Sequence, residues 1–309
     1  MSRVSVVIPN YRGGRLLREA VASVECQSLE DWELVIVSDG CLDDLSDLES
    51  DRRVHHIRQP RRGVSVARNV GIAHASADLV AFLDDDDRML PERLLTQVGA
   101  MDDTEIGLCH SQFRLIDENG NVFGTGESKD SQYRDFLRGD GNILLSTTMA
   151  RRAILCDVGG FNPLLPLAQD LDLLYRVARE TRLRFLPEVL SEYRRHSSNT
   201  WLDTATGGEE YKSMLRQHLF IAEARGERDN VKAIRRGLAL VPTGRASRHI
   251  REARQARADN RLPAMVTALA KAFLLSPRMT WAVVTRQARR EIAARRHGTR
   301  TTSPGGVSA

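Results

Sequence analysis

Residues 4–100 alternate between short apolar runs and longer amphipathic stretches. The short runs are rich in β-branched residues and predict strands over Val4–Ile8, Trp32–Val37, Val54–Arg58 and Leu79–Leu83. Between them, apolar spacing predicts one helix that buries Leu17, Ala20, Val21 and Val24, one over Val64–Ala75, and one opened by Pro91. Strands that alternate with such helices are joined by right-handed crossovers. We therefore predict an α/β fold, Rossmann-like, with a mostly parallel sheet flanked by helices.

The pattern changes at about Ile106. Strands are predicted over Ile106–His110, Phe113–Ile116, Leu183–Leu186 and Val189–Arg194, with a hairpin turn at Asn119-Gly120 and a helix over Leu171–Glu180. Beyond Leu202 the pattern is helical, over 209–225, 229–240, 246–259, 263–275 and 279–296, with breaks expected at Pro242, Pro263 and Pro277. We expect an α/β domain over residues 1–203, a helical C-terminal extension over 204–298, and a tail without regular structure over 299–309.

Composition supports a folded protein of about two domains. The 309 residues are 41% hydrophobic and 28% charged, which is enough apolar material for a core. The four cysteines are scattered without a C-x-x-C pair, so neither a zinc site nor a disulfide framework is indicated. The N-terminus has no signal-peptide pattern, and no apolar run approaches the ~20 residues needed to span a bilayer. We expect a cytoplasmic protein.

The net charge of +4 is unevenly distributed. Residues 245–300 carry 14 Lys and Arg against 3 Asp and Glu, whereas the rest of the chain is net acidic. The predicted helix 279–296 places Trp281, Val284, Ala288 and Ile292 on one face and several arginines elsewhere. This pattern indicates peripheral contact with an anionic membrane at its inner face. The alternative is a helix packed on the α/β domain with a solvated basic rim. No nucleic-acid-binding motif accompanies the arginines, so nucleic acid is not expected as a partner.

Four consecutive acids, Asp84 to Asp87, follow the buried run Leu79–Leu83. In parallel sheets, ligands bind beyond the carboxyl ends of the strands. Clustered carboxylates at such a position repel one another and suit a hard divalent ion such as Mg²⁺ or Mn²⁺. The alternative is a solvated acidic turn in which one Asp caps the helix opened by Pro91.

Four segments, in this order and spacing, resemble the family 2 glycosyltransferases of the GT-A fold: Val4–Tyr11, Glu33–Gly40, Gly63–Gly71 and Leu79–Asp87. The resemblance covers about residues 2–200. It implies a GT-A catalytic domain with a C-terminal helical extension. It also implies transfer of a sugar from a UDP- or dTDP-type nucleotide sugar to an acceptor hydroxyl, with inversion and with Mg²⁺ or Mn²⁺ as cofactor. The acceptor class stays open between a glycan, a lipid-linked molecule and a small molecule.

The resemblance also implies roles for individual residues of the N-terminal motifs. Pro9 and Tyr11 would lie at the nucleotide base, and Asp39 would accept a hydrogen bond from the ring N–H of the base. Arg68 and Asn69 would face the nucleotide. Asp86 would bind the metal, while Asp84 and Asp85 are candidates for the ribose hydroxyls and the water shell of the metal. The chain departs from the family at Ser38, where a second acid is common.

Gly159–Asn162 and Gln169–Leu173 resemble the family's glycine-rich loop and the following helix start. The resemblance assigns Asp170 as the general base that deprotonates the acceptor; the alternative for Asp170 is an acid in the first turn of a helix, where the macrodipole favours it. Gln169 replaces the family's glutamate, which should lower the pKa of Asp170, other things being equal. His196 resembles a residue that completes the metal shell or binds a phosphate, and Arg194 and Arg195 are candidates to neutralise phosphate.

Two rival functions remain open at this point. A non-catalytic protein that binds nucleotide sugars is suggested by Gln169 and Ser38. A sugar-nucleotide nucleotidyltransferase would share the strand–helix opening, and Arg12-Gly13-Gly14-Arg15 weakly resembles its glycine-rich loop. No suitable lysine follows that segment, and unused clustered acids would only destabilise a fold.

Overall fold

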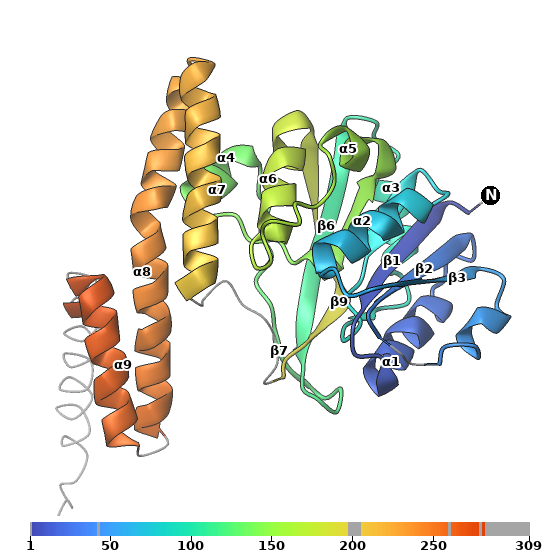
Figure 1. Ribbon diagram of the computed structural model, residues 1–309, viewed down its shortest axis with the longest axis horizontal. Coiled ribbons are helices and arrows are strands. Elements are labelled where there is room, and N and C mark those ends of the chain that lie inside the picture. Colours follow the sequence, from blue (N-terminus) through green and yellow to red (C-terminus); the bar gives the residue numbers. More distant parts are fainter. Residues whose placement is uncertain (1, 42–43, 197–204, 259–260, 278–279, 282–309) are drawn as a thin grey trace, which may run out of the picture. The chain divides into compact units, whose positions relative to one another are not determined.

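The computed structural model describes residues 2–41, 44–196, 205–258, 261–277, 280 and 281 (Figure 1). The chain forms two compact units, Met1–Leu238 and Ala239–Ala309. The expected domain boundary at 203/204, nearly all of the predicted helix 279–296, and the predicted tail 299–309 lie outside the described residues. No helix within the described ranges combines the length and the apolar character needed to cross a membrane.

The first unit is built on one sheet, which confirms the predicted α/β class. Its strands are β1 (Val4–Asn10), β2 (Trp32–Asp39), β3 (Val54–Gln59), β4 (Leu79–Phe82), β5 (Arg88–Met89), β6 (Ile106–Ile116), β7 (Val122–Thr125), β8 (Thr148–Arg151) and β9 (Arg182–Arg194). The strand order is β3-β2-β1-β4-β8-β6-β9-β5, and β7 pairs with β6. The pairs among β3, β2, β1 and β4 are parallel, as predicted, and β6 is parallel to β9. Antiparallel pairing of β8 with β4 and β6 makes the sheet mixed.

Helices alternate with these strands, and after β9 the described residues form helices and no further strand. Their bounds are α1 (Gly14–Glu25), α2 (Val64–His74), α3 (Arg93–Ala100), α4 (Tyr133–Arg138), α5 (Arg152–Asp157), α6 (Gln169–Glu180), α7 (Ala205–Ala224), α8 (Arg228–Ala258) and α9 (Leu262–Leu275). Single 3₁₀ turns occur at Leu48–Ser50 and Leu145–Thr147. The parallel strands β1 and β2 are buried along their whole length. Such strands need cover on both faces, and helices provide it.

One face of the sheet forms the main core. Leu17 and Val21 of α1 and Leu94 of α3 belong to the same buried cluster as Val6 and Ile8 of β1. The predicted helix with Leu17, Ala20, Val21 and Val24 on its buried face is confirmed as α1. These contacts fix the direction of β1, so that its carboxyl end emerges between α1 and α2.

On the opposite face, α2 approaches β1 very closely. A Cβ atom built on Gly71 would lie 2.3 Å from Cγ1 of Val7, so only glycine allows this separation. The helix begins after Gly63, whose φ of 94° lies in the left-handed region that favours glycine. The close approach brings the start of α2 to the same edge as the ends of β1 and β2.

Three breaks predicted from the sequence are wrong. The strands expected at 106–110 and 113–116 form the single strand β6, and those expected at 183–186 and 189–194 form β9. A register shift falls between Ser111 and Gln112, whose partners are Leu186 and Val189. This bulge accommodates Pro187, which cannot donate to the ladder, without ending either strand.

The third wrong break is at Pro242. Helix α8 runs unbroken from Arg228 to Ala258, where the sequence predicted separate helices over 229–240 and 246–259. A proline removes one backbone donor and strains one turn, but long runs of strong helix formers on both sides can carry a helix through it.

Candidate active site

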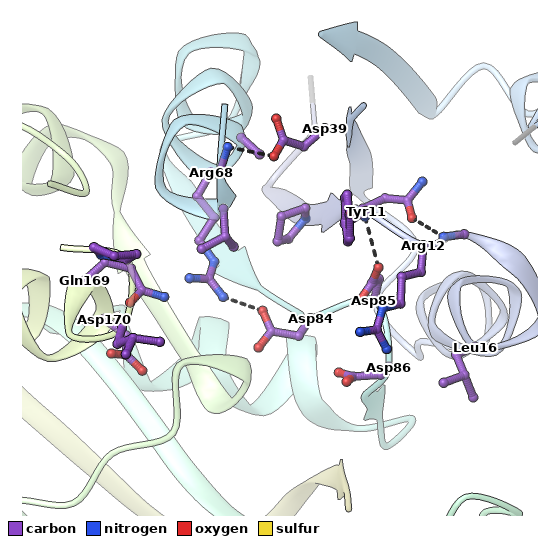
Figure 2. A pocket seen from close by; sticks show the side chains of 18 of the residues that line it. Tyr11, Arg12, Leu16, Asp39, Arg68, Asp84, Asp85, Asp86, Gln169 and Asp170 are labelled. Atoms are coloured by element: carbon purple, nitrogen blue, oxygen red, sulfur yellow. Dashed lines mark hydrogen bonds and ion pairs between the residues drawn. The ribbon is translucent and has the colours of Figure 1, made fainter. Parts of the chain in front are cut away.

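A cavity of about 420 Å³ opens at the carboxyl ends of β1, β2 and β4 (Figure 2). The strand order reverses between β1 and β4, and such a switch point is where doubly wound sheets bind ligands. The cavity is lined by all candidate residues except Asn69, Arg194 and Arg195, namely Pro9, Tyr11, Asp39, Arg68, Asp84, Asp85, Asp86, Asp170 and His196. In Figure 2, Gln169 and Asp170 lie on one side, Tyr11 on the other, and Asp84 between them.

Asp39 ends β2 and is nearly fully buried. Its Oδ1 accepts hydrogen bonds from the backbone N–H of Arg62 (2.6 Å) and from Nε2 of Gln59 (2.7 Å), and its Oδ2 accepts one from the N–H of Gly63 (2.7 Å). The carboxylate therefore shapes the turn into α2. A carboxylate has about four lone-pair sites, so one acceptor position stays available toward the cavity.

Tyr11 follows β1 and exposes its ring at the mouth of the cavity. The guanidinium of Arg61 lies 4.3 Å from the centre of this ring. The backbone N–H of Tyr11 donates to Oδ2 of Asp85 (3.2 Å), and the Asn10 side chain accepts from the N–H of Gly13 (2.7 Å). The loop after β1 is thus tied to the acidic loop after β4.

The acidic loop, Asp84 to Asp87, packs its carboxylates together in a partly buried position. Burial, helped by repulsion from Asp86, raises the pKa of Asp85 to about 6. Burial and the charge of Asp84 raise the pKa of Asp86, although a hydrogen bond with His196 opposes this. Raised pKa values mean that the ionised loop is unfavourable alone, so it favours a bound positive charge.

Asp86 and His196 are the residues best placed to hold a metal. Oδ2 of Asp86 lies 2.8 Å from Nε2 of His196. Over the described ranges, no cluster of three or more His, Cys, Asp or Glu surrounds one metal position. Mg²⁺ is commonly held by one or two protein ligands together with substrate phosphates and water. The residues present therefore fit a metal that is completed by a diphosphate, and they do not form a closed protein cage.

Arg68 of α2 is only 4% exposed and is incompletely paired. Its Nη2 donates to Oδ1 of Asp84 (2.5 Å). Within the part of the chain that the structure describes, its Nε and Nη1 are buried and have no hydrogen-bond partner. Leaving such donors unpaired costs about 1–3 kcal/mol each. They are therefore available to an anionic or hydroxyl-bearing ligand in the cavity.

Gln169 and Asp170 begin α6 on the far side of the cavity. Oε1 of Gln169 is buried and, among the described residues, has no donor. Burial raises the pKa of Asp170, and the charge of Arg68 opposes this rise. The expectation that Gln169 lowers the pKa of Asp170 relative to a glutamate at the same position stays a prediction. A more basic carboxylate is better suited to accept a proton near neutral pH.

Asn69 is placed away from the cavity. Its Nδ2 donates to the backbone oxygen of Phe161 (2.8 Å), and its Oδ1 accepts from the N–H of Phe161 (2.7 Å). The amide therefore holds the chain just before the loop that leads to Gln169 and Asp170. The expected contact with the nucleotide stays a prediction that this geometry does not favour.

Other side chains near the acidic loop behave differently from the sequence-based expectation. Arg194, a candidate for binding phosphate, is fully buried and donates to the backbone oxygens of Asp86 and Asp117 and to the Glu19 carboxylate. Asp87 accepts from the N–H of Arg194 (2.9 Å) and does not cap α3, which begins at Arg93. Sequence reasoning missed the role of Arg93, a buried arginine that donates to the backbone oxygens of Phe82 and Thr148. Its only local indication was an arginine within an apolar helix face.

Comparison with known proteins defines the class. Residues 5–153 match the family "Glycosyl transferase family 2". An uncharacterized glycosyltransferase of Nostoc sp. is 28% identical over 230 residues, which is 68% of this chain and 70% of that protein. An uncharacterized glycosyltransferase of Rickettsia felis is 33% identical over 123 residues, but the match spans only 20% of that protein and 38% of this chain. This N-terminal part of the chain is thus similar to members of glycosyltransferase family 2.

Solved structures confirm the fold. S. aureus TarS 1-349 in complex with UDP-GlcNAc superposes with a TM-score of 0.64 at 18% identity, covering 91% of this chain and 83% of that chain. GalNAc-T7 with UDP, GalNAc and Mn²⁺ superposes with a TM-score of 0.56 at 16% identity, covering 72% and 50%. The chain therefore has the GT-A fold, with additional C-terminal helices.

Proposed function

We propose that the protein is an enzyme that transfers a sugar from a UDP- or dTDP-type nucleotide sugar to an acceptor hydroxyl, with inversion at the anomeric carbon and with Mg²⁺ or Mn²⁺. The family supports glycosyl transfer, and two proteins of the same fold bind UDP-GlcNAc, or UDP with GalNAc and Mn²⁺, in their crystal structures. The finer assignments of donor, metal and stereochemistry are supported by the chemistry of the cavity.

One observation carries the proposal. The cavity contains buried donors on Arg68 and a buried acceptor on Gln169 that have no partner among the described residues, beside a basic carboxylate on Asp170. A sugar diphosphate offers what these groups lack, since its phosphate oxygens accept hydrogen bonds and its sugar hydroxyls donate them.

The donor would lie along the ends of the parallel strands. The base would stack on the exposed ring of Tyr11, next to Pro9, and would reach the remaining acceptor position of Asp39. The diphosphate would approach the acidic loop, where Asp84 and Asp85 would bind ribose hydroxyls or water. Asp86 and His196 would hold the metal, which would supply positive charge for the departing diphosphate.

Asp170 would act as the general base. The acceptor oxygen attacks the anomeric carbon as its proton passes to the Asp170 carboxylate. The new C–O bond forms while the bond from the anomeric carbon to the phosphate oxygen breaks, and the nucleoside diphosphate leaves with that electron pair. Because Asp170 must be ionised, we expect the rate to fall as the pH drops through its raised pKa.

Asp170→Asn tests the proposal. A panel of UDP- and dTDP-sugars with Mn²⁺ should first identify the donor, by release of nucleoside diphosphate. The variant should then lose at least about 10²-fold in kcat while its affinity for UDP in calorimetry stays unchanged. The exposed Asp157→Asn is the matched control and should behave as the wild type.

The two rival functions give different results in the same panel. Binding of a donor without turnover, across a broad set of acceptors and with water, would support a non-catalytic nucleotide-sugar-binding protein, as Gln169 suggested. Pyrophosphate release from a nucleoside triphosphate and a sugar phosphate would support a nucleotidyltransferase.

Membrane contact through the C-terminal helices belongs to the same proposal. Helix α9 buries Ala268 and Ala272 and exposes Leu262, Val266, Phe273 and Leu274. Residues 261–281 contain three basic residues and no acid. Apolar side chains with nearby positive charge favour an anionic lipid surface. The chain should therefore sediment with vesicles containing phosphatidylglycerol but not with phosphatidylcholine alone, and Phe273→Glu combined with Leu274→Glu should abolish the difference.

A further inference from the structure

Helix α6, which begins with Gln169 and Asp170, has no capping side chain at its N-cap position, and within its first turn the N–H of Leu171 donates to Oδ1 of Asp170 (2.8 Å). Its N-cap residue is Ala168, and no side chain at that position can accept a hydrogen bond from the first turn. The first N–H groups of a helix need partners from outside it. Ser, Thr, Asp or Asn at the N-cap normally provides one.

A residue far along the chain binds the backbone just before the first turn. Oε2 of Glu210, in α7, accepts hydrogen bonds from the backbone N–H of Leu167 (2.9 Å) and of Ala168 (3.0 Å). Both bonds end on the same oxygen atom. A carboxylate at this place also complements the positive end of the α6 dipole. Helix α7 therefore holds the entry of α6, although it belongs to the part of the chain that follows the sheet.

The residues held by Glu210 are next to the chemistry. Leu167 lines the cavity, and Gln169 and Asp170 follow within three residues. The same segment is fixed at its other end, where Asn69 forms two hydrogen bonds with the backbone of Phe161. Between these two attachments Leu164 is 85% exposed, whereas Leu165 is buried. Glu210 thus fixes the backbone directly before Gln169 and Asp170.

We propose that Glu210 is a positioning residue for the general base: its two hydrogen bonds hold the start of α6 so that the Asp170 carboxylate faces the sugar. The inference rests on the proposed function, since it assigns Glu210 a task in that reaction. The two sides of the cavity are then held by different elements. The side that would bind the nucleotide is held by the strand ends and α2, and the side with Asp170 is held by α7.

The test compares Glu210→Ala with Glu210→Gln. Because one oxygen accepts both bonds, glutamine can keep them and loses only the charge, whereas alanine loses both. The probe is the release of UDP from UDP-GlcNAc with water as acceptor, in the presence of Mn²⁺. We expect the alanine variant to lose about tenfold or more in kcat with an unchanged KM for the donor, because small misplacements of catalytic groups slow reactions strongly. We expect the glutamine variant to stay within about twofold of the wild type.

The control is Glu209→Ala, which removes an exposed neighbour on α7 that pairs with Lys212. It should leave kcat and KM unchanged. An alanine variant at 210 with wild-type kcat would overturn the proposal, as would a glutamine variant that falls equally far. A parallel loss of UDP affinity in the alanine variant would also overturn it, because the residue would then support the whole cavity.

Hydrogen–deuterium exchange of the peptide covering 165–172 gives a readout that does not need turnover. We expect exchange to rise about tenfold in Glu210→Ala and to stay at the wild-type level in Glu210→Gln. If the wild type released no UDP from any donor, the proposed function would fail. Unchanged exchange in the alanine variant would instead refute the role of Glu210 alone.

Discussion

The two halves of the sheet differ in what they do for the cavity. The parallel half, β3-β2-β1-β4, ends in side chains that face the cavity, such as Tyr11, Asp39 and Asp84. The mixed half contributes Arg194 of β9, whose side chain lies behind the acidic loop and binds its backbone. These side chains of the parallel half face a ligand, whereas Arg194 holds the acidic loop; β9 also contributes Tyr193 to the cavity, and His196 follows it.

Two buried arginines show the difference most clearly. Arg194 is 0% exposed, and its Nε, Nη1 and Nη2 all donate to oxygens of the protein. Arg68 is 4% exposed, and of its three nitrogens only Nη2 has a partner among the described residues. A buried arginine with complete pairing indicates a structural role, whereas one with unpaired donors in a cavity indicates a binding role.

Replacing Arg194, in the mixed half of the sheet, should have the largest effect on stability. Arg194→Met would remove one of the arginines that pair with Glu19, together with the side-chain donor to the backbone oxygens of Asp117 and Glu118. We expect the free energy of unfolding in urea to fall by about 3–5 kcal/mol. The control is Arg15→Met, because Arg15 pairs with the same Glu19 from a 61% exposed position. It should lose no more than about 1 kcal/mol, and a similar loss in both variants would contradict the distinction.

Replacing Arg68, on α2 beside the parallel half of the sheet, should reduce turnover and leave stability nearly unchanged. Arg68→Met removes the unpaired donors, so we expect kcat/KM to fall about 10²-fold with little change in the free energy of unfolding. The charge of Arg68 lowers the pKa of Asp170, so its loss should raise that pKa further. The acid limb of the pH–rate profile should then move to higher pH. An acid limb that stayed at the wild-type pH would show that the charge of Arg68 does not influence the pKa of Asp170.

A smaller effect is expected at Asp39. Asp39→Asn replaces one acceptor oxygen by an amide donor, which cannot accept from the N–H of Arg62 or of Gly63. The turn into α2 should loosen, and UDP affinity in calorimetry should fall about tenfold. Asp44→Asn, at an exposed carboxylate that follows the same strand, should have no effect. Equal affinities for UDP in wild type and Asp39→Asn would show that Asp39 does not contribute to nucleotide binding.

The smallest effect concerns the acidic loop and has the opposite sign. The pKa of Asp85 in the folded protein, about 6, lies above its ordinary value of 3.8. The protonated form therefore stabilises the fold at low pH, and that stability is lost as the pH rises from about 4 through 6. Asp85→Asn in a chelator should raise the free energy of unfolding by about 1 kcal/mol at pH 8 and leave it unchanged below pH 4. A lower free energy of unfolding of Asp85→Asn at pH 8 would show that burial and the charge of Asp86 do not destabilise the Asp85 carboxylate.

Sequence patterns predicted the parallel half of the sheet better than the mixed half. Val4–Ile8 is a short run rich in β-branched residues and Val64–Ala75 is a helical stretch, and they correspond to β1 and α2. Strand β8 and helix α4 were not predicted, because Thr148–Arg151 is not an uninterrupted apolar run and Tyr133–Arg138 is too short for a helical period to show. The bulge that carries β9 past Pro187 depends on its partner β6, which local sequence does not reveal.

Residues of the candidate site also differ in how far the local sequence shows where they lie. Most motif residues that line the cavity lie at or just after the ends of β1, β2 and β4, so their placement followed once the strands were recognised, whereas Arg68 and Asp170 lie on α2 and α6. The contact of Asn69 with Phe161 joins residues 92 positions apart, and that of Glu210 with Ala168 joins residues 42 positions apart. No local pattern marks such pairs, because an amide or a carboxylate is compatible with many partners. The roles assigned to the lining residues stay predictions for the experiments above.

At Gly71 there is no room between α2 and β1 for even a methyl group, since a Cβ would lie 2.3 Å from Val7. Alanine at this position would push α2 outward and draw Arg68, one turn earlier, away from Asp84. Gly71 does not line the cavity, so distance from the ligand is a poor guide to which positions tolerate change in this domain. A mutagenesis library restricted to the lining residues would pass over one of its most sensitive sites.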